Sequence, residues 1–177
     1  GAAGPVGETM RHNLELVTSS ARRLTNLVND LLDLSTLEAR ETELNTRPIS
    51  LSKLARDVVS LAAGARGDKP VEVRAAVRDD LPAVLVDPDR VEQILLNLVS
   101  NAIKFTAKGH VEVRAQLQDG RIRVSVEDSG IGIETEAQQR IFQAFEQANP
   151  DVVQLYGGTG LGLAVAKELV ELHGGQL

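Results

Sequence analysis

The chain has 177 residues, of which 42% are hydrophobic and 25% charged, and its net charge is −6. This balance is typical of a folded globular protein, and the length allows one ordinary domain with a helical appendage but not two large domains. The acidic charge argues against a nucleic-acid surface or an anionic-membrane surface, since both need clustered Lys and Arg. Cysteine is absent, which excludes disulfides and thiolate metal sites.

No apolar run approaches the roughly 20 residues of a membrane span, and no signal peptide opens the chain. We therefore expect no membrane contact from this segment and a cytoplasmic location. Residues 1–5 are read as a loop, so we expect that the parent protein can continue upstream and carry a membrane anchor.

Residues 8–38 predict one long amphipathic helix. Its apolar residues step alternately by four and three positions, which is the spacing of a coiled-coil seam. Such a stripe needs cover from a helix of the same chain, from a second copy, or from the domain that follows. The seam residues are Met10, Leu14, Val17, Ala21, Leu24, Val28 and Leu31.

The rest of the chain predicts strands and helices behind a polar linker that ends in Pro48. Alternation on both sides of Asp119-Gly120 predicts a hairpin of residues 111–117 and 121–127. Further strands are expected at residues 49–51, 71–77 and 84–86. Helices are expected after a Ser52 cap, from 89 to 105 behind Pro88, near 136–145, and from 161 to 173.

These elements predict an α+β fold, a two-layer sandwich in which helices cover a mixed sheet, preceded by one long coiled-coil-like helix. Residues 1–45 would form the helical part with its linker. Residues 46–177 would form the α+β domain, with its last strands expected to be missing.

The first stretch with chemical character lies on the helix expected at 89–105. Asn97, Asn101 and Lys104 are four and three positions apart and so share one face. Amide oxygens can ligate Mg²⁺, and an ammonium group can neutralise phosphate oxygens. The same pattern also fits an ordinary solvated helix face.

The second stretch follows a predicted strand, where Asp128 is succeeded by Gly130 and Gly132. Glycines at such a place let a flat ligand approach the main chain closely. The Asp128 carboxylate could accept a hydrogen bond from the amino group of adenine. Alone, the stretch also fits a glycine-rich turn.

The third stretch is a glycine cluster, residues 157–163, directly before a helix. Consecutive amides at a helix N-terminus favour a bound phosphate. No strand leads into the cluster and no Lys-Ser/Thr pair closes it, so it is neither the dinucleotide fingerprint nor a Walker loop. It also fits a flexible helix-entry loop.

The order and spacing of the three stretches resemble the histidine-kinase branch of the ATPase superfamily that includes gyrase, Hsp90 and MutL. Residues 24–35 resemble the second helix of that family's dimerisation and histidine-phosphotransfer hairpin. The resemblance implies a Bergerat-type ATP site in the sandwich. The family's N box, first glycine box, F box and second glycine box resemble residues 94–106, 128–133, 141–147 and 158–163.

The resemblance implies that the chain binds ATP with Mg²⁺ and transfers the γ-phosphoryl group to a histidine, for relay to a response-regulator aspartate. Asn101 would ligate Mg²⁺, Lys104 would contact phosphate, and Asp128 would read the adenine amino group. Asn97 joins the catalytic set at the place where gyrase-like relatives have a Glu. The other implied nucleotide contacts are Phe105, Gly130, Gly132, Ile133, Gly158, Thr159, Gly160, Leu161 and Gly162.

The implied partners are the receiver domain of a response regulator and a second copy of the chain, bound through the helical hairpin. None of the three histidines, His12, His110 and His173, fits the family's acceptor motif. The acceptor is therefore expected outside this segment, which should not phosphorylate itself.

Two rival functions differ in class. A degenerate nucleotide-binding scaffold of a signalling complex is the alternative, because the implied ATP lid, residues 147–156, has no Lys or Arg. An ATP hydrolase of the gyrase or MutL type, or a serine kinase of the anti-sigma type, is disfavoured. Asn97 is a poor base, and the helix of residues 8–38 and the phenylalanines of residues 141–147 also count against both.

Overall fold

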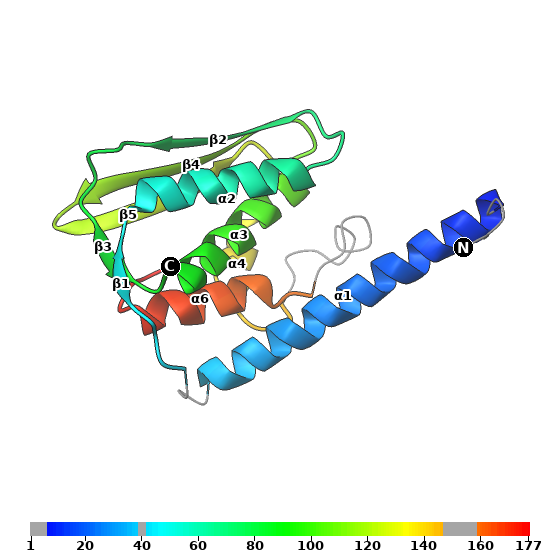
Figure 1. The fold of residues 1–177 in the computed structure, drawn as a ribbon, viewed down its shortest axis with the longest axis horizontal. Helices are drawn as coiled ribbons and strands as arrows, with labels where there is room; N and C mark the ends of the chain where they lie inside the picture. The colour runs from blue at the N-terminus through cyan, green and yellow to red at the C-terminus, as the bar shows by residue number, and fades with distance from the viewer. Residues whose placement is uncertain (1–6, 39–41, 147–158) are drawn as a thin grey trace, which may run out of the picture.

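The computed structural model describes residues 7–38, 42–146 and 159–177. A long helix leads into a body in which helices pack on a sheet (Figure 1), so the predicted α+β fold with a mixed sheet is confirmed. The elements are α1 (Glu8–Glu38), β1 (Arg47–Ile49), α2 (Leu51–Ala65), β2 (Val71–Val77), β3 (Val84–Val86), α3 (Pro88–Phe105), β4 (Gly109–Gln118), β5 (Arg121–Asp128), α4 (Thr135–Gln138) and α6 (Gly162–Leu172).

The main sheet has the order β2-β4-β5, in which β4 pairs parallel with β2 and antiparallel with β5. The predicted hairpin turn is confirmed, since Asp119 and Gly120 have φ angles of 50° and 75°. Positive φ at both central residues matches the twist of the flanking strands. β1 and β3 form a separate antiparallel pair, with Arg47 opposite Val86.

Helices α2 and α3 cover one face of the main sheet (Figure 1). Because neighbouring residues of a strand point to opposite faces, β4 turns Val111 and Val113 into the core and Glu112 to the other face. Glu112 forms ion pairs there with Arg74 and Arg114. The core between sheet and helices includes Val58, Leu95, Val99, Val111 and Val113.

The predicted Ser52 cap is wrong, because Ser50 caps α2. The Ser50 hydroxyl accepts the N–H of Lys53 at 3.4 Å. Ser52 lies in the first helical turn, is buried, and donates to the carbonyl of Arg78. Strand β1 ends two residues earlier than predicted, so the helix starts at Leu51, whose side chain enters the core.

The helix expected near residues 136–145 is much shorter than predicted, since α4 ends at Gln138. Single turns follow it, in which Arg140 N–H donates to Ala137 O and Gln143 N–H to Arg140 O, both at 2.9 Å. Phe145 then has a φ of 64°, which a helix cannot accommodate. Its N–H donates to the carbonyl of Gly160 at 3.1 Å, so tertiary pairing replaces the helix.

The start of α3 is fixed by Asp87. Its Oδ1 accepts the N–H groups of Asp89 and Arg90, and its Oδ2 accepts that of Asn45 at 2.9 Å. Burial raises the pKa of Asp87, but these N–H groups outweigh it and hold the pKa below its usual value. The Asp87 N–H in turn donates to Nε2 of His173, which ties the end of α6 to the start of α3.

The last turns of α1 pack on α6, whereas its earlier part projects from the body (Figure 1). Leu34 and Leu37 are buried together with Leu161 and Val165. The seam upstream is exposed at Met10, Leu14, Val17, Ala21, Leu24, Val28 and Leu31. Among residues 7–38, 42–146 and 159–177, packing on the same chain therefore covers only the end of the stripe. No helix within residues 7–38, 42–146 and 159–177 combines the length and apolarity needed to cross a membrane.

Candidate functional site

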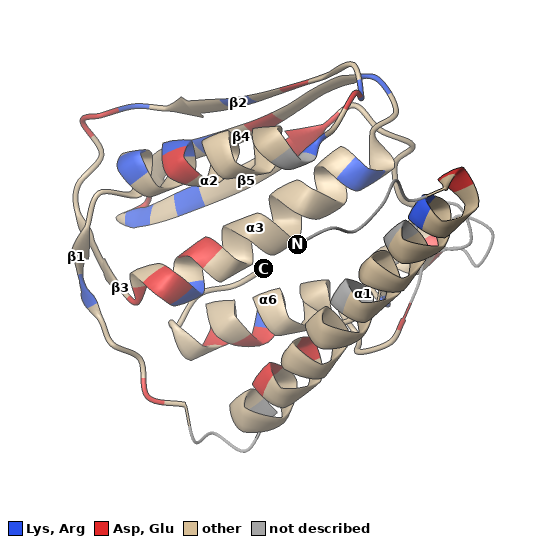
Figure 2. Cartoon of the chain, turned by 45° about the vertical axis from the view of Figure 1, so that its right-hand side comes forward, with Lys and Arg blue, Asp and Glu red and all other residues tan. Residues whose placement is uncertain are grey.

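Helix α3 carries the first predicted set of site residues. Acidic Asp89 lies in its first turn and basic Lys104 in its last, and both positions complement the helix dipole. Figure 2 shows charged residues at both ends of α3 and uncharged residues between them. Asn97, Asn101 and Lys104 are all half-buried. The predicted polar face is thus partly open to solvent, while Val99 on another face is fully buried.

Asn97 joins this face to the third stretch. Its Nδ2 donates to the carbonyl of Gly162 at 3.0 Å, and Gly162 is the first residue of α6. A Cβ built on Gly162 would lie 3.6 Å from the Asn97 amide, an ordinary contact. The two stretches are separated by 65 residues in sequence, so the tertiary fold brings them together.

The Asp128 loop is attached to the end of α3. Ile131 N–H donates to the carbonyl of Phe105 at 3.3 Å, and Gly130 N–H donates to Oδ1 of Asp128 at 2.8 Å. A Cβ on Gly130 would lie 2.5 Å from the Phe105 oxygen, so this approach requires glycine. Gly132 adopts a φ of 71°, in the left-handed region that also favours glycine. The backbone of the second stretch therefore lies directly against the end of the helix that carries the first.

Ser129 anchors the same loop, although it is not among the predicted site residues. Its Oγ accepts the N–H of His110 at 2.9 Å, and its own N–H donates to the His110 carbonyl at 3.1 Å. A Cβ on Gly109 would lie 2.1 Å from that hydroxyl. Ser129 thus extends the β4–β5 pairing beyond Asp128 and holds the loop in place.

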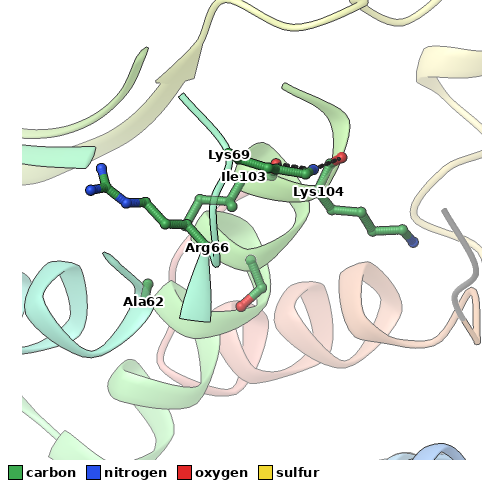
Figure 3. A pocket seen from close by; sticks show the side chains of 6 residues that line it. Ala62, Arg66, Lys69, Ile103 and Lys104 are labelled. Atoms are coloured by element: carbon green, nitrogen blue, oxygen red, sulfur yellow. Dashed lines mark hydrogen bonds between the residues drawn. The ribbon is translucent and has the colours of Figure 1, made fainter. Parts of the chain in front are cut away.

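Lys69, also missed by sequence reasoning, lies in the loop before β2. Its Nζ donates to the carbonyls of Ile103 and Lys104 at 3.0 and 2.8 Å and so satisfies the end of α3 (Figure 3). Lys104 Nζ lies 4.6 Å from the centroid of the Phe105 ring. Nothing in the sequence around Lys69 predicts that its side chain would cap α3, because a single Lys in a polar loop is common.

A hollow of about 200 Å³ lies between α2 and α3, near this end of α3 (Figure 3). Lys104 is the predicted site residue that lines it, and its ammonium group points away from the guanidinium group of Arg66. The lining of the hollow includes no residue of the second stretch and no described residue of the third. Its lining residues are Ala62, Arg66, Lys69, Ser100, Ile103 and Lys104.

Thr159 precedes α6 and connects it to α1. Its hydroxyl donates to Oδ2 of Asp30 and accepts the N–H of Leu161, both at 3.2 Å. The Leu161 side chain is fully buried against α1, so a ligand could meet only its backbone. Gly160 has a φ of 74° and its carbonyl accepts Phe145 N–H.

Of the remaining predicted residues, the structure describes Asp128 and Ile133 but not Gly158. Asp128 is exposed, and Ile133 is about half exposed, at 47%. Gly158 and the implied lid, residues 147–156, lie outside the described residues.

Comparisons with known proteins show the family to which the chain belongs. Residues 86–177 match the family model described as histidine kinase-, DNA gyrase B-, and HSP90-like ATPase. The chain is 41% identical to the circadian input-output histidine kinase CikA of Synechococcus elongatus over 99% of its own length and 24% of that protein. It is 39% identical to the signal transduction histidine-protein kinase BarA of Escherichia coli over 96% of its length and 19% of that protein.

Among solved structures, full-length ShkA in complex with AMPPNP resembles the chain with a TM-score of 0.79 at 36% identity. That likeness covers 97% of this chain and 35% of ShkA. The chain spans about a quarter or less of the length of CikA and BarA. The chain belongs to the histidine kinase-, DNA gyrase B-, and HSP90-like ATPase family, and its relatives are histidine kinases.

Proposed function

We propose that the chain is the catalytic ATP-binding region of a sensor histidine kinase, which binds Mg-ATP and supplies the γ-phosphoryl group to a histidine. The observation that carries this proposal is the hydrogen bond from Asn97 to Gly162, because it sets the polar face of α3 against the glycine-led start of α6. An amide-bearing helix face beside the N-terminus of a second helix suits a metal-bound polyphosphate.

The proposed roles are those that the family resemblance implies. Asn101 ligates Mg²⁺ through its amide oxygen, and Lys104 contacts phosphate oxygens. The Asp128 carboxylate accepts from the adenine amino group. Phe105, Gly130, Gly132 and Ile133 line the base, while Gly158, Thr159, Gly160, Leu161 and Gly162 meet the phosphates. Position 130 requires glycine because the loop packs backbone to backbone against α3. This requirement supports the assignment.

Catalysis by such a region is positioning and charge neutralisation. The metal supplies charge neutralisation of the phosphates when bound. Asn97, already engaged with Gly162, holds α6 in register with α3. As an amide it cannot act as a base toward water, which favours transfer to a protein nucleophile over hydrolysis.

The acceptor histidine is proposed to lie outside these 177 residues. His173 is engaged by Asp87 N–H and Leu169 O, and His110 has its backbone paired with Ser129. His12 lies on the exposed part of α1. We also propose that residues 1–45 belong to the dimerisation hairpin and 46–177 to the catalytic domain. The exposed seam of α1 then pairs in a homodimer, and a response-regulator receiver domain accepts the phosphoryl group.

A degenerate nucleotide-binding scaffold is the second candidate, and one sequence feature favours it. Residues 147–156 contain no Lys or Arg, so a closing lid would bring no cation to the phosphates. The kinase and the scaffold both bind nucleotide. They differ in transfer to a supplied acceptor hairpin, which only the kinase performs.

Calorimetry of Mg²⁺-dependent ATP binding tests the proposal on the unmutated chain and on Asn101→Ala. Ser100→Ala, an exposed neighbour one position away on α3, is the matched control. We expect Asn101→Ala to lower affinity at least tenfold, about 1.4 kcal/mol, and Ser100→Ala to leave it nearly unchanged. Absence of binding by the folded, unmutated chain would refute the assignment.

A further inference from the structure

Two acidic residues of α1 face the catalytic body through different contacts. Asp33 accepts from Nε2 of Gln93 at 2.7 Å and lies 3.6 Å from Nη1 of Arg90. Asp30, about one turn earlier, instead accepts from the hydroxyl of Thr159. Figure 2 shows acidic residues on α1 toward the end that packs on α6. Asp33 thus contacts α3, whereas Asp30 contacts the loop that enters α6.

Asp30 is half-buried at the contact between α1 and the loop that enters α6. The ion pairs found within the described residues include Arg90 with Asp33 but none that involves Asp30. Burial raises the pKa of Asp30, the Thr159 hydrogen bond lowers it, and the Asp33 charge raises it, with a net shift upward. A half-buried carboxylate with no ion-pair partner among the described residues acts on neighbouring charges with less screening than a fully exposed one.

Thr159 places this charge at the beginning of α6. The same hydroxyl that donates to Asp30 accepts the N–H of Leu161, the residue directly before the helix. The carboxylate is therefore linked through one hydroxyl group to the N–H of Leu161, one of the residues proposed to meet phosphate. A negative side chain near a helix N-terminus competes with an anionic ligand for the same positive end of the dipole.

We propose that Asp30 is a selectivity residue of the nucleotide site, which disfavours a nucleoside triphosphate relative to a diphosphate while α1 is packed on α6. This inference rests on the proposed phosphate-binding role of residues 159–162. A triphosphate brings one more negative charge than a diphosphate to the same site, so the Asp30 carboxylate repels it more strongly. The packed arrangement then suits the diphosphate left after transfer, and loading of the triphosphate favours withdrawal of the end of α1.

The test compares ATP and ADP affinities, with Mg²⁺ present, by calorimetry on the 177-residue chain. Asp30→Asn keeps the shape and the hydrogen bond with Thr159 but removes the charge. Asp33→Asn is the matched control, because it removes an equal charge from the same helix at a contact with α3 instead of α6.

We expect Asp30→Asn to raise ATP affinity about tenfold and ADP affinity by less than about threefold. The effect is larger for ATP because ATP carries one more negative charge, and one nearby unit charge changes a binding constant by roughly tenfold. Asp33→Asn should shift both affinities by the same factor. The expected gain in ATP affinity should shrink at high salt.

An unchanged ATP-to-ADP ratio in Asp30→Asn would overturn the inference. So would an equal change of that ratio in Asp33→Asn, because packing of α1 alone would then explain the effect. If Asp30→Asn fails to fold by circular dichroism, Asp30→Ser takes its place. Should the unmutated chain bind both nucleotides in an Asn101-dependent way while the ratio stays fixed, only this inference fails. If it binds neither nucleotide, the proposed function fails with it.

Discussion

Replacing Gly130 by alanine tests the close approach of the Asp128 loop to the end of α3. The new Cβ would lie 2.5 Å from the Phe105 carbonyl oxygen, 2.8 Å from Oδ1 of Asp128 and 3.0 Å from the Phe105 carbonyl carbon. Two of these three atoms belong to the backbone of Phe105, which cannot turn aside as a flexible side chain can. The loop must therefore move away from α3.

The expected loss of stability comes from the steric clash of the new methyl group and from one weakened hydrogen bond. Forcing an extra methyl group into a packed site costs about 1–3 kcal/mol, and the movement lengthens the Ile131 N–H to Phe105 O bond, which is already 3.3 Å. A net hydrogen bond contributes about 1 kcal/mol. We expect Gly130→Ala to lower the free energy of unfolding by about 2–3 kcal/mol.

Gly64→Ala is the control within the same chain. Gly64 is an exposed residue of α2, and a Cβ there would meet nothing within 4 Å. Alanine is the better helix former, so this change should stabilise the protein by up to about 1 kcal/mol.

Urea unfolding followed by circular dichroism measures both glycine variants. Nucleotide affinity should fall in Gly130→Ala, because the shift displaces Asp128, and stay unchanged in Gly64→Ala. A Gly130→Ala protein as stable as the unmutated chain would refute the close-approach reasoning.

Leu34→Ala should destabilise the chain by about 2–4 kcal/mol, since Leu34 is only 6% exposed in the contact of α1 with α6. Leu32→Ala is the control and should have little effect, because Leu32 is 59% exposed. Denaturant unfolding of the two variants compares their stabilities. Glu112→Gln should destabilise at neutral pH. Burial raises the pKa of Glu112, but Arg114 and Arg74 outweigh it and the net shift is downward. The stabilisation is therefore present above the ordinary glutamate pKa and lost as pH falls through the folded value. The free energies of unfolding of Glu112→Gln and of the unmutated chain should differ at neutral pH and become equal at strongly acidic pH. A difference that does not depend on pH would contradict this.

Most of the fold could be predicted because periodicity and local chemistry specify its elements. The alternation of residues 71–77, 111–117 and 121–127 predicted three strands, and Asp119-Gly120 predicted the turn that joins the last two. Pro88 after Asp87 marked the start of α3. The errors at Ser52 and after Gln138 arose where tertiary hydrogen bonds, to Arg78 and Gly160, outweighed local preference.

The residue types of the candidate site could also be recognised in the sequence. Spacing placed Asn97, Asn101 and Lys104 on one helical face, and the structure has them on α3, half-buried. Their proposed roles remain predictions that the Asn101→Ala experiment tests.

The sequence by itself determined which segments become helices and strands, and which polar residues lie on the same helical face, because those properties depend on neighbours a few positions away. Only the tertiary structure decided that Asn97 meets Gly162, that Lys69 closes the end of α3, and that Asp30 reaches Thr159. These contacts join residues up to 129 positions apart. No local pattern encodes them, since a side chain finds such a partner only after the hydrophobic faces of α1, α3 and α6 have packed together.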